Sequence, residues 1–260
     1  MTEKPAVKAD KTELNSGLLA VRSALTREYL PVAARLPENL QPEASWPERE
    51  VLPTLVLLPT LGKADLRPRA EKLALAMELC YLAGRVHDLA VAAADADGMY
   101  GRSILTGDYL YAAGAVQLAN AGYDNWLGKV GRILSRRAEA RLVSERWNER
   151  AYVPESEKIA NLAKDTAEGF SLAASMAADL AGLSAEQQQA YTEFGFYLGV
   201  LQGISLNGYR KGAAADEALA YCRRALLHIP ECAALAEEML LSKLAEEKTV
   251  SVPKAAYNRA

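Results

Sequence analysis

Phenylalanine, cysteine and histidine are scarce in this 260-residue chain, which contains three, three and two of them. β-Branched residues are also sparse, whereas alanine and leucine, both strong helix formers, are the most abundant residues. This balance excludes an all-β fold. The cysteines lack metal-ligand spacing and fall inside helical patterns, so the sequence predicts core thiols, with no disulfide and no zinc site. They are Cys80, Cys222 and Cys232.

Long hydrophobic runs are missing as well. The longest candidate, Val51 to Leu61, is shorter than the roughly 18 residues that a membrane span needs, and it contains two prolines, so no span is expected. The first eleven residues combine charges with Pro5 and lack an apolar stretch, which predicts a cytoplasmic protein without a secretory signal. A formal net charge of -3 argues against nucleic acid as a partner.

Apolar residues at intervals of three and four predict an all-α protein of eight or nine helices without strands. Asp124 is the expected N-cap of one helix, and Ser184 with Gln187 is typical of a capping box before another. The helices are expected over about 14–30, 65–87 and beyond, 104–119, 126–147, 154–182, the segment after Ser184, 216–227 and 232–244.

Seven prolines fall between Pro31 and Pro68, which predicts turns around one short apolar piece, Val51 to Leu58. This piece is interpreted as part of an extended arm or a lid. The chain therefore divides into an N-terminal helix with a Pro-rich arm (1–64), a single bundled helical domain (65–250) and a tail (251–260).

Three separated stretches resemble one known family. Gly107-Asp108-Tyr109-Leu110 is similar to the "LaGDyLla" segment of the all-helical trans-prenyl diphosphate synthases. Residues 166–202 keep the order of that family's "KTasLf…aa…lAG…yGeylGlafQ" pattern, from Thr166 to Gln202. Val86-His87-Asp88 stands where the family has "iHDDxxD", so the resemblance covers about residues 73–209. It implies a helical bundle of the isoprenoid-synthase type.

The departures from that pattern fall on the metal ligands. In active members of the family, two aspartate motifs hold Mg²⁺ ions, which bind an allylic diphosphate and neutralise its charge. The first motif keeps Asp88, while Leu89 and Ala92 occupy its other aspartate positions. The second motif has no carboxylate, and its positions are Ser205, Leu206 and Tyr209. The sequence therefore predicts no metal site, no catalytic residue and an apolar cavity lined by these neutral residues.

The resemblance implies a non-catalytic or regulatory subunit, similar to the small component I of heptaprenyl or hexaprenyl diphosphate synthase. The expected partner is a catalytic prenyl diphosphate synthase subunit, which would carry the Mg²⁺, so no cofactor is expected in this chain. The chain would complete the product tunnel, in contact with a prenyl chain, in isoprenoid or menaquinone side-chain synthesis. His87 and Asp88 would be remnants of the first motif. The other residues that match the family's motifs would have a structural role or lie near the ligand; they are Gly107, Asp108, Thr166 and Gln202.

Some of these residues also have local interpretations. Asp108 after Gly107 is typical of a helix N-cap, and His87 without a ligand partner is typical of a helix end or an interface. The basic residues of 126–147 favour a solvated, mixed-charge face over a diphosphate site, because glutamates share the same helix. They include Arg132, Arg136 and Arg137.

Gly195, Gly199 and Gly203 repeat every four residues, which favours close packing of two helices. A groove for a prenyl chain remains a second interpretation of this row. The row, or the apolar helix near Leu110, is also the expected contact with another helical protein.

Two other functions remain open. An active short-chain prenyltransferase could use atypical metal ligands drawn from Asp88, Asp95, Asp97 and Asp108. A helical interaction scaffold is suggested by residues 218–226, which faintly resemble a tetratricopeptide helix pair, although no repeat of about 34 residues is visible elsewhere.

Overall fold

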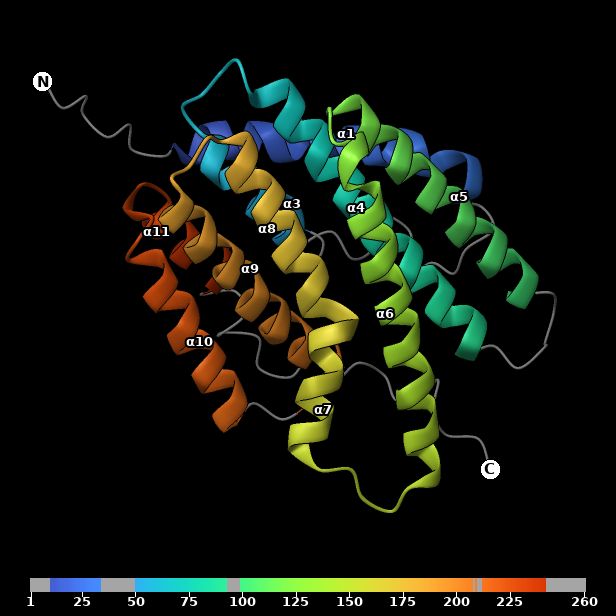
Figure 1. Cartoon of the computed structure of the whole chain (residues 1–260). Helices are drawn as coiled ribbons and strands as arrows, with labels where there is room; N and C mark the ends of the chain where they lie inside the picture. The colour runs from blue at the N-terminus through green and yellow to red at the C-terminus, as the bar shows by residue number, and fades with distance from the viewer. Residues whose placement is uncertain (1–9, 34–49, 93–98, 208, 210–211, 242–260) are drawn as a thin grey trace, which may run out of the picture.

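The computed structural model describes residues 10–33, 50–92, 99–207, 209 and 212–241. Every regular element in these ranges is helical, so the predicted all-α class is confirmed. The long helices lie beside one another in a bundle (Figure 1). None of the described helices is long and apolar enough to cross a membrane. The helices are α1 (Lys11–Ala33), α3 (Val51–Leu57), α4 (Arg67–Ala92), α5 (Met99–Asn120), α6 (Leu127–Arg146), α7 (Glu155–Leu162), α8 (Glu168–Leu180), α9 (Ala185–Leu206), α10 (Ala213–Leu226) and α11 (Pro230–Ala236).

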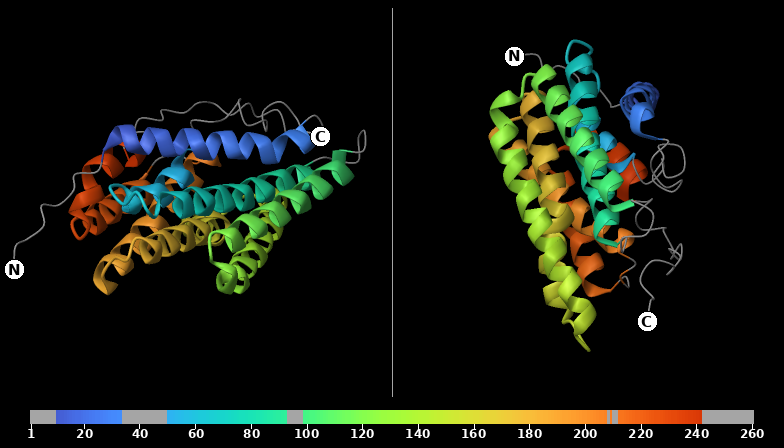
Figure 2. Two further views of the ribbon diagram at one scale, coloured as in Figure 1. Left: turned by 90° about the horizontal axis from the view of Figure 1, so that it is seen from above. Right: turned by 90° about the vertical axis from the view of Figure 1, so that its right-hand side faces the viewer.

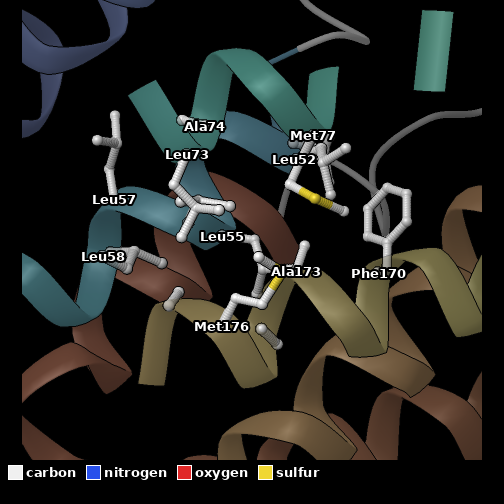
Figure 3. Close-up of a cluster of buried hydrophobic side chains, with 14 of the residues drawn as sticks. Leu52, Leu55, Leu57, Leu58, Leu73, Ala74, Met77, Phe170, Ala173 and Met176 are labelled. Atoms are coloured by element: carbon white, nitrogen blue, oxygen red, sulfur yellow. The ribbon is translucent and has the colours of Figure 1, made fainter. Parts of the chain in front are cut away.

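Helix α3 lies inside the bundle, so the prediction of an arm or lid around 51–58 is wrong. All seven of its residues are buried, because apolar side chains cover every face of the helix. Pro53 is tolerated in the first helical turn, where a backbone N–H has no intrahelical acceptor. Side chains of α3 and the following turn pack against α4 and α8 (Figure 3); they include Leu52, Leu55, Leu57 and Leu58, opposite Leu73, Ala74, Met77, Phe170, Ala173 and Met176.

Helix α1 lies across the outside of the bundle, on the face opposite α6 (Figure 2). Its predicted apolar stripe is buried and joins the same hydrophobic core as α3 and α4. The hydrophobic core is therefore continuous across residue 64, where the sequence-based division placed the boundary between the Pro-rich arm and the helical domain. The helix continues through Pro31 to Ala33, so the predicted end at Leu30 is wrong. A proline so close to the end of a helix removes at most one terminal hydrogen bond.

The helix ends confirm one predicted cap and correct another. The backbone N–H of Gln187 donates to Ser184 Oγ at 3.3 Å, and that of Ser184 donates to Gln187 Oε1 at 3.2 Å, which is the predicted capping box. Asp124 is not the N-cap of α6, because it begins a separate 3₁₀ turn that ends at Trp126. Pro154 precedes α7 as predicted, but one π-helical turn, Ala163–Ala167, joins α7 to α8.

The glycine row brings α9 into close contact with α8. A Cβ atom added at Gly195 would lie 2.7 Å from the Phe170 carbonyl oxygen, and one at Gly199 would lie 2.6 Å from Ala167 Cα. The interpretation as close packing is therefore confirmed. The interpretations of this row as a groove for a prenyl chain and as a contact with another protein are wrong, because all three glycines are buried within the chain. The other expected contact, the apolar helix near Leu110, stays a prediction: Leu110 itself is 0% exposed, whereas Leu105 and Val116 of the same helix are 71% and 57% exposed.

The three cysteines are free and buried, which confirms that they act as core residues. Burial raises the pKa of the Cys80, Cys222 and Cys232 thiols to about 12. At neutral pH the thiols are therefore protonated and unreactive.

Candidate functional site

Asp88 lies in the second half of α4 and accepts hydrogen bonds from two arginines of α6. Arg137 Nη2 donates to Oδ2 at 2.9 Å, and Arg141 Nε donates to Oδ1 at 2.8 Å. Arg141 Nη2 also donates to Oδ2. Arg141 thus binds the carboxylate with two parallel hydrogen bonds, and guanidinium groups occupy both oxygens.

A second carboxylate, Asp165, approaches the same arginines from the π-helical turn. Its Oδ1 lies 3.4 Å from Arg137 Nε and 3.5 Å from Arg141 Nε. Thr166, one of the motif matches, donates from Oγ1 to Asp165 Oδ2 at 3.3 Å. We refer to Asp88, Arg137, Arg141 and Asp165 as the ion-pair cluster. Its two positive and two negative side chains cancel in formal charge.

The ion-pair cluster is shielded from solvent. The side chains of Arg137 and Asp165 are 9% and 7% exposed. Burial alone would raise the pKa of Asp88, but the charges of Arg137 and Arg141 outweigh it and hold this pKa below its usual value. Burial also opposes the charge on Arg137, and the two carboxylates outweigh that effect and raise its pKa. Asp88 and Arg137 are therefore both charged at neutral pH.

Helix α4 provides the space and further contacts for Arg137. Gly84 has no side chain at this point, and an added Cβ would lie 1.6 Å from Arg137 Nη1. The same nitrogen donates to the Tyr81 carbonyl oxygen at 3.3 Å, and the guanidinium carbon lies 5.8 Å from the centre of the Tyr81 ring. The predicted solvated face is therefore wrong for Arg137, because this residue points inward from α6. The prediction holds better for Arg136, whose side chain is half exposed.

His87 contacts α5 and not the ion-pair cluster. Its Nε2 lies 3.2 Å from Asp108 Oδ1 and 3.2 Å from the Ile104 carbonyl oxygen. Gly107 makes this contact possible, because an added Cβ would lie 2.2 Å from the His87 ring. Gly107 and Asp108 lie in the middle of α5, which begins at Met99, so the predicted N-cap role of Asp108 is wrong. The contacts of His87 are those of a helix–helix interface.

The positions of the second motif lie at the end of α9 and just after it. Gln202 is 3% exposed, and its Oε1 has no hydrogen-bond partner within the described part of the chain. Ser205 and Leu206 are half-buried. Tyr209 packs beside a small apolar cluster, and Lys158 Nζ lies 5.6 Å from the centre of its ring. These side chains offer no carboxylate to a cation.

Two surface hollows flank α10. One, of about 500 Å³, lies between α7 and α10, and the other, of about 210 Å³, lies between α9 and α10. Neither is lined by Asp88 or by Ser205, Leu206 or Tyr209. The predicted apolar cavity therefore has no counterpart in these hollows. The side chains of Leu89 and Ala92, which were also assigned to it, lie outside the described residues.

No family model and no curated protein sequence matches the chain, but solved structures do. A geranylgeranyl pyrophosphate synthase from Lactobacillus brevis shares 15% identity over 90% of this chain and 97% of its own, with a TM-score of 0.68. The heptaprenyl diphosphate synthase from Staphylococcus aureus shares 17% identity over 87% and 97%, with a TM-score of 0.63. A deletion mutant of the heterotetrameric geranyl pyrophosphate synthase from mint shares 19% identity over 86% and 98%, with a TM-score of 0.52.

The chain has the isoprenoid synthase fold. At identities of 15–19% the likeness shows the fold alone. The alignments cover 86–90% of this chain and so extend well beyond residues 73–209, where the sequence resemblance lies.

The described residues do not fit the Mg²⁺ site that the family resemblance implies. Within the described ranges, no three His, Cys, Asp or Glu side chains gather where they could hold a metal ion. Asp88, which the sequence resemblance assigns to the first motif, has both oxygens bound to guanidinium groups. Asp95 and Asp97, which were considered as atypical ligands, lie outside the described residues.

Asp165 was not predicted as a site residue, and both Arg137 and Arg141 were expected on the polar surface of their helix. Two features of the sequence could have indicated the ion-pair cluster. Asp165 stands where the "KTasLf" pattern of the family has lysine, so the charge at this position is reversed. Arg137 and Arg141 are four residues apart and therefore share one face of α6. Only the packing of α6 against α4 and the π-helical turn shows that these residues meet Asp88.

Proposed function

We propose that the chain is a non-catalytic subunit that acts together with a catalytic prenyl diphosphate synthase. The observation that carries this proposal is the hydrogen bonding of Asp88, whose two oxygens are bound by Arg137 and Arg141. Permanent positive charges of the protein thus bind the carboxylate that, in the family's pattern, would bind a metal ion.

The energetics of the ion-pair cluster support this reading. For Asp88 to bind a cation, it would have to leave two guanidinium partners, and breaking a buried ion pair costs about 3–5 kcal/mol. A divalent cation at this place would also lie close to Arg137, which is held in position by Asp165 and Tyr81. Without metal ions, the charge on a leaving diphosphate would lack the stabilisation that is usually the largest catalytic contribution.

A partner subunit would supply the missing chemistry. One structural neighbour is named as a heterotetrameric geranyl pyrophosphate synthase, so the fold occurs in an assembly of unlike chains. Side chains of α3 fill the space between α4 and α8 in the present chain. We therefore expect its contribution to a product tunnel to be made at the boundary with the catalytic subunit, where it would set the length of a prenyl chain.

A prenyl-transfer assay tests the proposal. The purified chain is incubated with radiolabelled isopentenyl diphosphate, farnesyl diphosphate and Mg²⁺, alone and with the two-motif synthase of the same organism. We expect no product from the chain alone, and a change in product length or rate when it is added to the synthase. Turnover by the chain alone that is lost in an Asp88→Ala variant would contradict the proposal and favour an active enzyme. No effect on the synthase would favour a scaffold without an isoprenoid role.

A further inference from the structure

Arg141 is the outer of the two arginines in the ion-pair cluster. Its side chain is 22% exposed and that of Asp88 is 18% exposed, whereas the side chains of Arg137 and Asp165 are 9% and 7% exposed. Arg137 is also bound to α4 through the Tyr81 carbonyl oxygen. The cluster is therefore open to solvent on the side where Arg141 binds Asp88, and it is closed around Arg137.

A single atom of Arg141 joins two carboxylates that are far apart in the sequence. Its Nε lies 2.8 Å from Asp88 Oδ1 and 3.5 Å from Asp165 Oδ1. The two oxygens therefore cannot be farther apart than the sum of these two distances. Because a guanidinium group is always charged in a protein, Arg141 provides a fixed positive charge beside both carboxylates. This is the position that a cation bound by Asp88 and Asp165 would take.

Two carboxylates at this separation suit a small divalent cation. Mg²⁺ binds oxygen ligands at about 2.0–2.1 Å, keeps several of its waters and needs only one or two carboxylates from the protein. The retained waters can bridge the distance that remains between the two side chains. Thr166 Oγ1 donates to Asp165 Oδ2 at 3.3 Å, which leaves Oδ1 as the oxygen that faces Arg141. The open side of the cluster provides the entry path that a metal site requires.

We infer that Arg141 blocks a divalent-cation site whose ligands are Asp88 and Asp165. The quoted family pattern has lysine at the position of Asp165, so this pair of ligands has no counterpart in that pattern. With Arg141 present, the cluster is neutral and two guanidinium groups repel a cation. Without Arg141, the other three side chains carry one net negative charge. The biological meaning of the blocked site rests on the proposed function, because the chain would stay free of metal at the Mg²⁺ concentration that its catalytic partner needs.

Titration of the full-length chain with Mn²⁺ tests the inference, because the electron paramagnetic resonance signal of the free ion falls as the ion binds. Arg141→Ala should bind one additional Mn²⁺ per chain, at least about 10-fold more tightly than the native chain does, because a positive charge next to the site is removed. Adding Asp165→Asn to Arg141→Ala should abolish this gain. The matched control is Arg136→Ala, which frees a single carboxylate, Glu168, from an ion pair of 2.6 Å and should bind Mn²⁺ no better than the native chain.

Thermal unfolding followed by circular dichroism separates a lost site from a lost fold. Mn²⁺ should raise the unfolding midpoint of Arg141→Ala and leave those of the native chain and Arg136→Ala unchanged. Arg141→Gln, which keeps part of the aliphatic stem, is the second variant and should respond in the same direction.

Three results would overturn the inference. They are equal Mn²⁺ binding by the native chain and the Arg141 variants, a gain that survives Asp165→Asn, and Arg141 variants that stay unfolded even with Mn²⁺, since the cation should replace the guanidinium group. Prenyl transfer is not measured in these experiments, so the inference and the proposed function can fail independently.

Discussion

The contact of α6 with α4 and the contact of α9 with α8 are stabilised in opposite ways. The first depends on charge, because Arg137 and Arg141 bind Asp88 and Asp165 in a shielded position. The second depends on the absence of side chains, since Gly195 and Gly199 let two helix backbones approach closely. Both contacts lie at positions where the sequence resembles prenyl diphosphate synthases. The glycine contact keeps the quoted pattern, whereas the charged contact departs from it.

This difference shows which part of the fold can change its chemistry. This close backbone contact leaves no room for an added atom, so Gly195 and Gly199 cannot be replaced even by alanine without a loss of stability. An ionic contact requires balance of charge and not particular residues, so a carboxylate can exchange a metal partner for a guanidinium. The predictions below test these two kinds of contact, beginning with the largest expected effect.

Replacing Arg137 with Leu should lower the free energy of unfolding by about 3–5 kcal/mol, because Asp88 and Asp165 would remain buried with one guanidinium fewer. Urea denaturation followed by circular dichroism measures the change. Arg136→Leu is the control, since its ion pair with Glu168 is half exposed and should contribute less than about 1 kcal/mol. Equal losses in the two variants would show that the ion-pair cluster is not a structural centre.

Gly199→Ala should lower the free energy of unfolding by about 2 kcal/mol, because the new methyl group would lie 2.6 Å from the Ala167 backbone and would separate α8 from α9. The midpoint of thermal unfolding reports this loss. A variant as stable as the native chain would mean that the two helices can move apart without cost, and that the glycine row is not a packing requirement.

The pH dependence of stability should identify Asp88. Its pKa in the folded chain lies below the usual value, so its contribution is present above the unfolded pKa of about 3.9 and is lost as pH falls through the folded pKa. Asp88→Asn should therefore be less stable than the native chain at pH 7, and the difference should narrow below about pH 4. Urea midpoints of both proteins at pH 7, 5 and 3 give the comparison. A difference that is independent of pH would contradict the role of ionised Asp88.

The smallest expected effect is a gain of stability when Gly169, near the start of α8, is replaced. An added Cβ there would meet a single atom, Ile133 Cγ2 at 4.0 Å, which is ordinary van der Waals contact. Gly169→Ala should therefore raise the free energy of unfolding by about 0.5–1 kcal/mol, because alanine loses less conformational entropy in a helix. Thermal unfolding of the Gly169→Ala and Gly199→Ala variants gives the comparison. A loss of stability in both variants would mean that α8 is constrained along its whole length.

The sequence by itself determined the all-α class, most helix positions, the capping box and the packing role of the glycine row. These features depend on local properties, namely helix propensity, apolar periodicity and the hydrogen bonds of a single turn. That Ser205, Leu206 and Tyr209 offer no carboxylate also follows from the sequence, because it needs only residue identity.

Tertiary structure alone decided where α3 lies and what Asp88 binds. An apolar segment between prolines has the same local pattern in an arm and in a core, and only the helices around it, α4 and α8, distinguish the two. Asp88 is 49 residues from Arg137 and 53 from Arg141, and no local signal gives the distance between them. The N-cap role of Asp108 was wrong for the same reason, since Gly107 lies inside α5 and makes room for His87 of another helix. Contacts between residues so far apart depend on how helices pack, which is a property of the whole chain.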